Sequence, residues 1–369
     1  MMAGNSLDLR RRRYFEMSAR IAQIENAWLR PRFEAGEPGG GWGRNHTLDI
    51  GGCPVFVKRL PITDLEFENL FSTRNLYGLP PYYHYGVGSV GFGVFREFVA
   101  HVKTTNAVLD GRIENFPLLY HYRVVPFWGE RAAEVDRERH NGYVAYWGGD
   151  ENMGRYLLDR AAARHELVLF LEHVPHVLQP WLLENSDKVG GVLDDLRRAV
   201  SFLRENGVIH FDAHFHNVLI DGVLAYLTDF GLVLDKGFDL AADEAAFFDA
   251  HTHYDDGEVL SCLSYPVYQA YEALPGNDKR RLAERYGLPE AEGDADFGER
   301  IPLLLDNIEA LHADGLLKLD TGYLDAVVRY RGVITLMNDF YTTLRRNPRK
   351  DTPFPHDALR RLLEEAGFV

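Results

Sequence analysis

The chain has 369 residues, 46% of them hydrophobic and 12% aromatic, so it can bury a substantial core, and we expect two lobes rather than one. Its formal net charge of -15 argues against a protein that binds nucleic acid or anionic membranes nonspecifically. The same charge would suit a cationic substrate. Cys53 and Cys262 form no Cys-x-x-Cys pair, and no apolar run reaches the roughly 18 residues of a membrane span, so we expect a cytoplasmic protein.

Residues 1–32 are predicted to form an N-terminal helical extension. Apolar residues recur at helical spacing between Leu7 and Leu29, and Pro31 ends the pattern. The run of arginines over 10–13 is typical of the solvated end of such a helix rather than of a site for an anionic partner.

A glycine-rich stretch over 36–43, which includes Gly39 and Gly41, precedes a predicted strand over 54–58. The strand is rich in valine and ends at Lys58. The glycines do not match Gly-x-Gly-x-x-Gly, yet they lie far enough before Lys58 to leave room for a hairpin. We therefore expect a glycine turn followed by paired strands.

A second glycine-rich stretch, over 86–91, matches Gly-x-Gly-x-x-Gly outright and is followed by Lys103. Too few positions separate Gly91 from Lys103 for a hairpin and a full strand, so Lys103 is the second choice for a strand-ending lysine. We expect the segments on either side of these glycines to form a β-hairpin. Between the two stretches, residues 63–71 are predicted to form a capped helix with a buried stripe.

The segment 113–165 contains a predicted strand, FPLLYHYRVV, and a predicted helix over 153–163, and no chemistry can be assigned to it. A buried strand is expected over 166–172, and Pro175 stops it. The next predicted helix has one apolar face and leads the chain into His210.

The stretch 207–235, GVIHFDAHFHNVLIDGVLAYLTDFGLVLD, is the most informative part of the sequence. Two short β-prone runs flank Asp221-Gly222, which is a strong signal for a tight hairpin. Because a hairpin brings its ends together, the polar groups before it should lie beside the Asp229-Phe230-Gly231 turn after it. Those polar groups are His210, Asp212, His214 and Asn217.

Two carboxylates and a carboxamide at one place suit magnesium and phosphate chemistry, because Mg²⁺ prefers oxygen ligands and takes only a few of them from protein. The spacing of these polar groups resembles the catalytic loop and the metal-binding turn of the protein-kinase-like superfamily. His214 makes the loop more similar to aminoglycoside and choline phosphotransferases, since protein kinases typically carry lysine there. The Asp-Phe-Gly turn resembles that of the protein kinases.

The resemblance implies an α+β, bilobal protein-kinase-like fold. A small β-rich lobe would span residues 33–172, with the segment 113–165 as an insertion, and a larger, mainly helical lobe would span residues 173–369. The resemblance also implies ATP and Mg²⁺ as cofactors, with transfer of the γ-phosphate to a hydroxyl group.

For the candidate site, the resemblance implies a role for each residue. Asn217 and Asp229 would bind Mg²⁺. Asp212 would accept a hydrogen bond from the acceptor hydroxyl and take its proton late in the reaction. Lys58 would hold the α- and β-phosphates of the nucleotide.

The same resemblance implies three supporting features. A glycine-rich loop would cover the phosphates, either the stretch with Gly39 and Gly41, which we prefer, or the stretch over 86–91. The strand that ends at Glu172, with Val174 beyond it, would hold the adenine ring. A glutamate would pair with the lysine, and the candidates in order of preference are Glu68, Glu66 and Glu97.

The part of the chain after Asp235 departs from the protein kinases. No Ala-Pro-Glu segment follows the Asp-Phe-Gly turn, and helical patterns run on to Val369. Such a short link leaves little platform for a peptide, so the expected acceptor is a small molecule, and a cationic one would suit the acidic chain. A protein serine/threonine kinase is the alternative.

Three further interpretations stay open. An adenylyltransferase, which binds the nucleotide in a flipped orientation, and a pseudokinase would both use the same fold. A metallohydrolase would instead use closely spaced histidines and carboxylates for zinc or manganese, although its signature is incomplete. Those residues are His210, Asp212, His214 and His216, with His251, His253, Asp255 and Asp256 further on.

Overall fold

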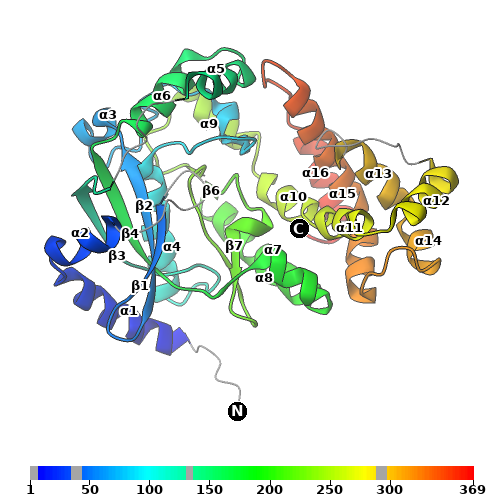
Figure 1. Cartoon of the computed structure of the whole chain (residues 1–369), viewed down its shortest axis with the longest axis horizontal. Coiled ribbons are helices and arrows are strands. Elements are labelled where there is room, and N and C mark those ends of the chain that lie inside the picture. The colour runs from blue at the N-terminus through cyan, green and yellow to red at the C-terminus, as the bar shows by residue number, and fades with distance from the viewer. Residues whose placement is uncertain (1–6, 35–43, 130–135, 288–296) are drawn as a thin grey trace.

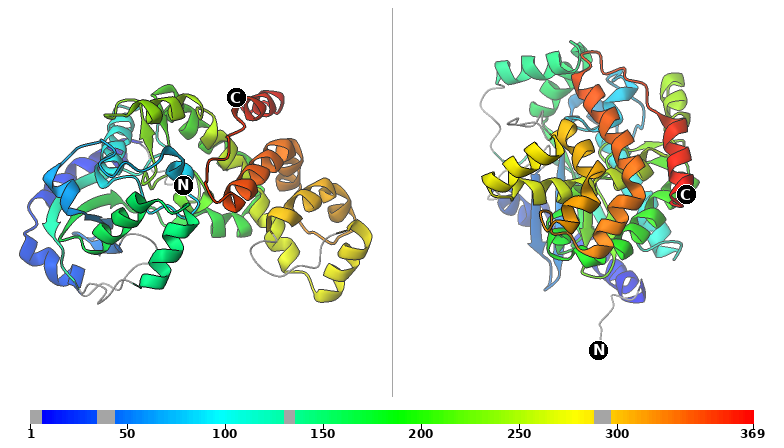
Figure 2. Two further views of the ribbon diagram at one scale, coloured as in Figure 1. Left: turned by 90° about the horizontal axis from the view of Figure 1, so that it is seen from above. Right: turned by 90° about the vertical axis from the view of Figure 1, so that its right-hand side faces the viewer.

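The structure, a computed structural model, describes residues 7–34, 44–129, 136–287 and 297–369. The chain is an α+β protein in which helices predominate, and its described strands form three antiparallel sheets. The largest sheet lies toward one end of the molecule and the C-terminal helices lie toward the other (Figure 1, Figure 2). None of the described helices is long and apolar enough to cross a membrane.

The largest sheet has the strand order β1-β2-β4-β3, and every neighbouring pair is antiparallel. Its strands are β1 (Arg44–Asp49), β2 (Pro54–Ile62), β3 (Leu119–Pro126) and β4 (His165–Glu172). Strand β2 pairs with β4 so that Val55 lies opposite Glu172 and Ile62 lies opposite His165. The expected strands are confirmed at these places, although β2 continues past Lys58.

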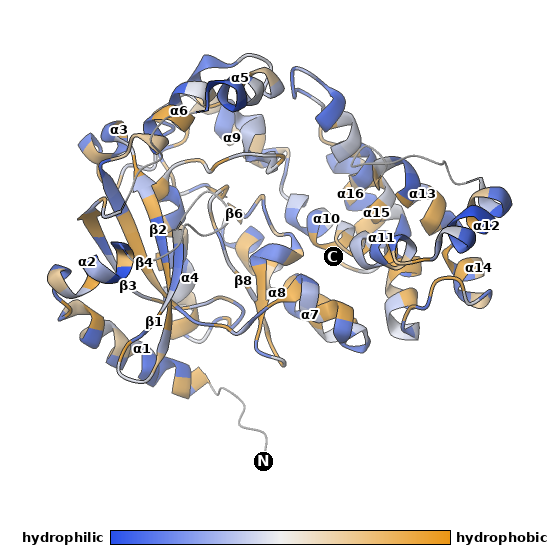
Figure 3. Ribbon diagram, in the orientation of Figure 1, coloured by the Kyte–Doolittle hydropathy of each residue, from blue (hydrophilic) through white to orange (hydrophobic). Residues whose placement is uncertain are grey.

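Side chains alternate between the two faces of this sheet, as the pleat of a strand requires. The helices that cover the faces are α1 (Leu7–Ala22), α2 (Asn26–Glu34) and α4 (Val94–Leu109). Val57 belongs to the core that α1 and α2 cover, whereas Leu60 packs against α4. Figure 3 shows the hydrophobic stretches along these strands. Because Lys58 is two positions from Leu60, it points to the face that α4 covers.

The expected hairpin after the polar loop is confirmed. Its strands are β7 (Val218–Ile220) and β8 (Ala225–Leu227), and β5 (His176–Val177) adds a third strand. The turn spans residues 221–224, because Ile220 and Ala225 are the last paired residues of the two strands. The Asp221 carboxylate stabilises this turn by accepting hydrogen bonds from the amides of Val223 and Leu224, each at 2.9 Å. Strand β6 (Val208–Ile209) pairs with β9 (Leu234–Asp235), so the two ends of the stretch 207–235 also lie side by side.

The other helices mostly follow the sheet strands in sequence. They are α5 (Arg137–Tyr146), α6 (Glu151–Ala161), α7 (Leu178–Glu184), α8 (Val189–Glu205), α9 (Ala242–Asp249), α10 (Tyr254–Ser261), α11 (Ser264–Glu272), α12 (Gly276–Tyr286), α13 (Phe297–Asp306), α14 (Ile308–Ala313), α15 (Thr321–Arg346) and α16 (His356–Glu365). Helix α8 is the one expected to lead into His210, and its apolar face packs against α10 and α15. The helical character of the C-terminal part is confirmed.

Two expectations about the segment 63–109 are wrong. Only the short α3 (Asp64–Glu68) forms where a longer helix is expected. The β-hairpin expected around the second glycine-rich stretch is replaced by a 3₁₀ helix (Pro81–Tyr85), a loop and α4. The apolar residues of α4 recur at helical rather than alternating spacing, and the glycines of the loop have positive φ angles that suit a loop better than a strand.

Candidate active site

Lys58 projects from the middle of β2 toward α4 and reaches two carboxylates. Its ammonium nitrogen lies 2.6 Å from Oε1 of Glu97 on α4 and 2.7 Å from Oδ1 of Asp229. Burial alone would lower the pKa of Lys58, but the negative charges of Asp229 and Glu97 more than compensate and raise it above its ordinary value. Lys58 is therefore a fixed cation near neutral pH.

The glutamate that pairs with Lys58 is not the expected one. Glu68 ends α3 and is exposed to solvent. Glu66 is buried but caps α3, because its Oε2 accepts hydrogen bonds from the backbone amide and the hydroxyl of Thr63, both at 2.9 Å. Glu97, the third candidate, lies in the first turn of α4 and meets Lys58 because α4 packs across the face of the sheet to which Lys58 points.

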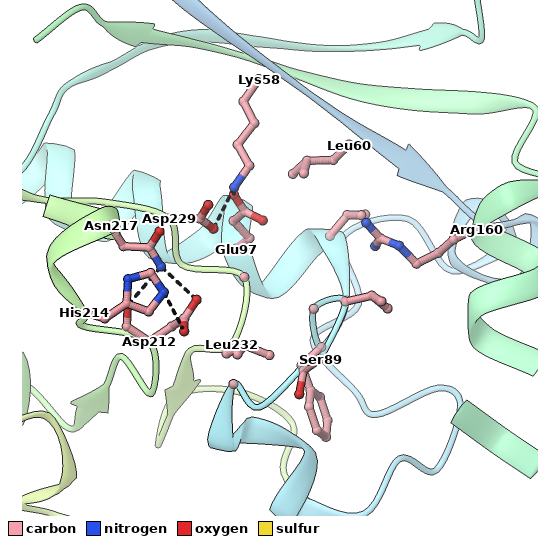
Figure 4. A pocket seen from close by; sticks show the side chains of 18 of the residues that line it. Lys58, Leu60, Ser89, Glu97, Arg160, Asp212, His214, Asn217, Asp229 and Leu232 are labelled. Atoms are coloured by element: carbon pink, nitrogen blue, oxygen red, sulfur yellow. Dashed lines mark hydrogen bonds and ion pairs between the residues drawn. The ribbon is translucent and has the colours of Figure 1, made fainter. Parts of the chain in front are cut away.

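Asp212 lies in the loop that leads into a 3₁₀ turn (Phe215–Asn217). The side-chain amide of Asn217 donates hydrogen bonds to the backbone oxygen of Asp212 at 2.9 Å and to its Oδ2 at 2.8 Å. Nε2 of His214 lies 3.4 Å from Oδ1 of the same carboxylate. Figure 4 shows these three side chains together at one edge of a cavity, with Lys58 and Asp229 nearby. The expected convergence of the polar loop and the acidic turn is confirmed.

His210 is fully buried and ties this loop to the strand before Asp229. Its Nε2 donates to the backbone oxygen of Thr228 at 3.0 Å, and its Nδ1 accepts from the backbone amide of Asp212 at 3.2 Å. Burial lowers the pKa of His210 to about 4, so the ring is neutral near pH 7. This geometry agrees with the structural role that we expect for His210.

Two buried carboxylates of α10 hold the backbone of the loop. Asp255 accepts hydrogen bonds from the amides of His210 and Phe211 at 2.7 and 2.9 Å, and Glu258 accepts one from the amide of Ala213 at 2.6 Å. Burial raises the pKa of both carboxyl groups, that of Asp255 to about 7. Sequence reasoning considered Asp255 only as a metal ligand and missed Glu258, because no local pattern shows that α10 packs beneath the loop.

Asp212 and Asp229 have pKa values that their surroundings push in opposite directions. Burial and the negative charge of Asp229 raise the pKa of Asp212 to about 7. Burial would also raise the pKa of Asp229, but the charge and the hydrogen bond of Lys58 lower it to about 2. This pair offers one carboxylate that can act as a base near neutral pH and one that is permanently ionised.

The Asp-Phe-Gly turn is anchored by its aromatic ring. Phe230 is fully buried, and its ring centroid lies 4.9 Å from that of His101 and 5.0 Å from that of His210. Asp229 has a left-handed backbone with φ of 65°, which is strained for a residue with a side chain. The buried ring therefore helps to hold the Asp229 carboxylate toward Lys58.

The second glycine-rich stretch, continued to residue 93, crosses this site. The amide of Phe92 donates to the backbone oxygen of Gly231 at 2.8 Å. A Cβ atom added to Gly86 would lie 2.8 Å from Oδ1 of Asp212, and Gly86 has a φ of 69°. Both observations require glycine at this position.

The preferred glycine-rich stretch, with Gly39 and Gly41, lies outside the described residues. Lys103, the second choice of lysine, is part of α4 rather than of a strand. Its ammonium group pairs with Asp235 at 2.5 Å and does not line the cavity that holds Lys58.

The cavity beside Lys58 has a volume of about 390 Å³. In Figure 4, Lys58 and Leu60 enter it from β2, Ser89 enters from the glycine-rich loop, and Arg160 enters from α6. Glu97, Asp212, His214, Asn217 and Asp229 complete the polar part of the wall. Sequence reasoning missed Arg160, because the segment that carries it has no recognisable motif.

The residues expected to hold adenine do not line this cavity. Glu172 is buried at the end of β4, where a guanidinium nitrogen of Arg10 lies 2.7 Å from its Oε2. Arg10 is itself buried and also donates to the backbone oxygens of Glu114 and Phe116, so the expectation of a solvated arginine is wrong at this position. Val174 is half-buried next to this ion pair in sequence.

A second cavity, of about 230 Å³, adjoins the first at Asp212. Gly86, Asp212 and His214 line both cavities. The other walls carry amide, hydroxyl, aromatic and charged side chains, among them Gln179, Glu258, Ser261, Tyr265, Asn338, Tyr341 and Arg345. The two cavities therefore meet at the carboxylate whose pKa is about 7.

Asp229 and Asn217 offer one carboxylate and one amide oxygen to a metal ion. In Figure 4 the amide nitrogen of Asn217 faces Asp212 and its oxygen lies on the side of Asp229. This donor set fits Mg²⁺, which takes most of its ligands from phosphates and water.

The residues that a metallohydrolase would need do not gather. No group of three or more His, Cys, Asp or Glu side chains that could hold a metal occurs in the described part of the chain. Nε2 of His251 instead lies 2.7 Å from the hydroxyl of Tyr85, and Nδ1 of His253 lies 2.9 Å from Oδ2 of Asp256.

Comparison with known proteins adds no assignment to this geometry. No protein-family model matches the sequence, and no curated protein matches it. The function must therefore be inferred from the chemistry of the residues themselves.

Proposed function

We propose that the protein is an ATP- and Mg²⁺-dependent phosphotransferase that transfers the γ-phosphate to a hydroxyl group of a small molecule. The observation that carries this proposal is the convergence of a lysine, an amide and three carboxylates in one cavity. These residues are Lys58, Glu97, Asp212, Asn217 and Asp229. They come from β2, α4, the polar loop and the acidic turn, which are distant in sequence.

The order of the elements supports a bilobal kinase-like fold. The four-stranded sheet and α4 would form the smaller lobe, and the hairpin with the helices from α7 onward would form the larger one. Lys58 belongs to the first of these lobes and Asp212 to the second. A cavity between them would place nucleotide and acceptor in line, and such positioning supplies most of the catalysis in phosphoryl transfer.

The charges of the residues support a distinct role for each. Asp229 and Asn217 would hold Mg²⁺, which, when bound, neutralises the charge of the phosphates. Lys58, fixed by Glu97, would contact phosphate oxygens. The oxygen of the acceptor hydroxyl would bond to the γ-phosphorus, and Asp212 would take the proton of that hydroxyl. The bond between the γ-phosphorus and the β–γ bridging oxygen would break and release ADP.

The second cavity supports a small-molecule acceptor. Its volume of about 230 Å³ suits a small molecule better than a polypeptide segment, and it reaches Asp212 from the side of α10 and α15. The raised pKa of Glu258 and the presence of Arg345 leave the wall without a clear excess of negative charge. The cavity therefore gives no preference to a cationic acceptor over a neutral one.

One observation favours adenylyl transfer as a second candidate. The main cavity includes Leu60 and Arg160, which lie toward the C-terminal end of β2. Val55, which pairs with Glu172, lies near the N-terminal end of the same strand. A nucleotide whose terminal phosphates lay at the C-terminal end of β2 would bring its α-phosphate, rather than its γ-phosphate, toward Asp212.

Labelled ATP distinguishes these reactions. The purified chain of 369 residues is incubated with Mg²⁺, a panel of hydroxyl-bearing small molecules, and ATP labelled at the α- or the γ-phosphate. Label from γ-labelled ATP on a small molecule is the expected result. Label from α-labelled ATP would indicate adenylyl transfer, γ-label on a polypeptide would indicate a protein kinase, and no transfer together with no nucleotide binding would contradict the proposal.

A further inference from the structure

Among the described residues that line the second cavity, Arg345 is the only arginine or lysine. It lies in the last turn of α15, and the same helix presents Ile334, Asn338 and Tyr341 to the cavity. Residues that are three or four positions apart lie above one another on a helix, so these four side chains form one row. The guanidinium carbon of Arg345 lies 5.7 Å from the centre of the Tyr341 ring. The row therefore ends at a positive charge.

Arg345 has no carboxylate partner in the part of the chain that the structure describes. The arginines that follow it do have partners. A guanidinium nitrogen of Arg346 lies 2.6 Å from Oε1 of Glu299, and Nε of Arg349 lies 3.2 Å from Oδ2 of Asp351. A guanidinium group is charged at any physiological pH, and its planar fork of donors matches a carboxylate or a phosphate. The charge of Arg345 is therefore available to an anion that enters the cavity.

The other titratable groups of this cavity carry little charge near neutral pH, with one exception. Burial lowers the pKa of His214 and of His216, so both rings are neutral. Burial and the negative charge of Asp212 raise the pKa of Glu258 well above its usual range. The exception is Asp212 itself, whose pKa is about 7. The cavity thus combines a base at its junction with the main cavity and a permanent cation at Arg345.

The contacts of Tyr341 show how Arg345 lies relative to Asp212. The hydroxyl of Tyr341 is 3.4 Å from Oε1 of Glu258, and Oε2 of Glu258 accepts a hydrogen bond from the amide of Ala213. Ala213 directly follows Asp212, so Tyr341 lies beside the polar loop. Arg345 is about one helical turn further along α15, a rise of roughly 6 Å. A small molecule in this cavity can therefore place one end at Asp212 and another at Arg345.

Gln179 gives the same cavity a buried amide without a partner. It belongs to α7 and is only 7% exposed, yet its side chain forms no hydrogen bond with any described residue. Buried amides normally have partners. Asn338 is also 7% exposed, and its amide nitrogen donates to the backbone oxygen of Gly298 at 2.9 Å, which leaves its own oxygen unengaged in the described part. These groups are suited to a ligand that carries hydroxyl groups.

We propose that the acceptor in the second cavity is a hydroxylated small molecule with an anionic group, a carboxylate or a phosphate, that pairs with Arg345. Gln179 would bind its hydroxyl groups, and the reacting hydroxyl would lie at Asp212. The inference rests on the proposed function, because it names the substrate class of the same reaction. The acidic composition of the chain would suit a cation, but the permanent charge in this cavity is positive, and nearby charges act more strongly than distant, screened ones.

Two series of probes test the preference for an anion. One consists of glucose, glucuronate, glucose 6-phosphate and glucosamine, and the other of glycerol, glycerate and glycerol 3-phosphate. Binding to the purified chain of 369 residues is measured by calorimetry in the presence of ADP and Mg²⁺. In at least one series an anionic member should bind roughly tenfold more tightly than the neutral one, and the tighter of carboxylate and phosphate identifies the anion. No such preference in either series would overturn the inference.

Variants of Arg345 test the origin of the preference. Arg345→Gln should weaken binding of the anionic probe by roughly tenfold and leave the neutral probe unchanged. Arg345→Glu should favour glucosamine over glucuronate, a reversal that a folding defect would not produce. Arg346→Gln is the matched control, because Arg346 is the adjacent exposed arginine and lines neither cavity. A preference for the anion that persists in Arg345→Gln would contradict the inference.

Gln179→Met tests the amide separately, because methionine keeps the length of the side chain and removes its hydrogen-bonding groups. The variant should weaken neutral and anionic probes by a similar factor and keep the preference between them. Unchanged affinity for both kinds of probe would contradict the part of the inference that concerns Gln179.

Transfer from ATP separates this inference from the proposed function. If the chain transfers the γ-phosphate to neutral or cationic acceptors in preference to anionic ones, only the acceptor class is wrong. If anionic probes bind through Arg345 but ATP neither binds nor reacts, the anion site stands and the proposed function fails.

Discussion

The ammonium nitrogen of Lys58 lies 2.7 Å from Oδ1 of Asp229, although 171 positions separate the two residues in the sequence. The contact joins β2 of the large sheet to the turn that follows the hairpin. It also fixes the charge state of both groups, since it raises the pKa of Lys58 and lowers the pKa of Asp229 to about 2. The role of this ion pair can be tested by replacing either Lys58 or Asp229.

Replacement of Lys58 by methionine should remove the cation and leave the Asp229 carboxylate without its partner. We expect kcat/KM for ATP-dependent transfer to fall roughly a hundredfold or more, because a preorganised donor to the phosphates is lost. Lys103→Met is the matched control, since Lys103 is 46% exposed and pairs with Asp235 outside the cavity. Equal losses in the two variants would show that the position of Lys58 is not special.

Replacement of Glu97 by glutamine should leave Lys58 with a single carboxylate partner. We expect the KM for ATP to rise roughly tenfold, because a charge-assisted hydrogen bond that orients the lysine is lost. Glu68→Gln is the control, since Glu68 is exposed at the end of α3, and steady-state kinetics should not distinguish it from the unchanged chain. A rise in KM in Glu68→Gln alone would reverse the assignment.

Replacement of Gly86 by alanine should displace Asp212. The new methyl group would lie 2.8 Å from Oδ1 of Asp212, so the carboxylate must move, and we expect transfer to slow by roughly a hundredfold. Gly222→Ala is the control, because Gly222 also has a positive φ but has nothing within 4 Å of the added Cβ. Both variants should lose about 1–2 kcal/mol of unfolding free energy, as denaturant titration would measure, but only Gly86→Ala should lose activity.

The parts of this site that are close in sequence could be predicted, and those that depend on packing could not. The hairpin signal at Asp221-Gly222 predicts that the segment with Asp212 and Asn217 lies beside Asp229, and the pairing of β7 with β8 agrees with it. The partner of Lys58 depends instead on how α4 crosses the sheet, which local spacing does not encode. The capped helix that carries Glu66 and Glu68 has the stronger local signal, but it is short and directs its buried glutamate to its own cap.

The same reasoning explains the missed residues and the misread loop. Arg160 lies on α6 in a segment without a motif, and only the packing of α6 beside β2 brings it to the cavity. The glycines over 86–91 fit a strand turn as well as a loop in sequence, and their positive φ angles are apparent only in the folded chain. Arg10 belongs to the run of arginines over 10–13, whose sequence is typical of an exposed segment, but its guanidinium group pairs with the buried carboxylate of Glu172.

Removal of divalent metal should abolish both transfer and tight ATP binding. Asp229 and Asn217 offer too few protein ligands to hold Mg²⁺ alone, so the metal and the phosphates of ATP should bind together. Chelation by EDTA is therefore expected to lower the affinity for ATP, and added Mg²⁺ should restore it. Asp229→Asn should lose the Mg²⁺-dependent part of ATP binding measured by calorimetry, while Asp212→Asn should keep it and lose transfer. Activity that zinc alone restores after chelation would contradict this assignment and favour a metallohydrolase.

The dependence of transfer on pH should report the ionisation of Asp212. Its pKa is raised to about 7, and only the ionised carboxylate can take a proton from the acceptor, so kcat/KM should rise with pH up to about 7 and level off above it. Neither Asp229, with a pKa of about 2, nor His210, with a pKa of about 4, should add an inflection near neutral pH.

The Lys58→Met variant also tests which group produces that inflection. The charge of Lys58 lowers the pKa of Asp212, so its removal should move the inflection of the residual activity to higher pH, whereas Lys103→Met should leave it in place. A profile that is flat from roughly pH 5 to 9 in the unchanged chain would rule out Asp212 as the base. An inflection that stays in place in Lys58→Met would assign it to a group that does not sense Lys58, because a buried carboxyl beside that ammonium must respond to its loss.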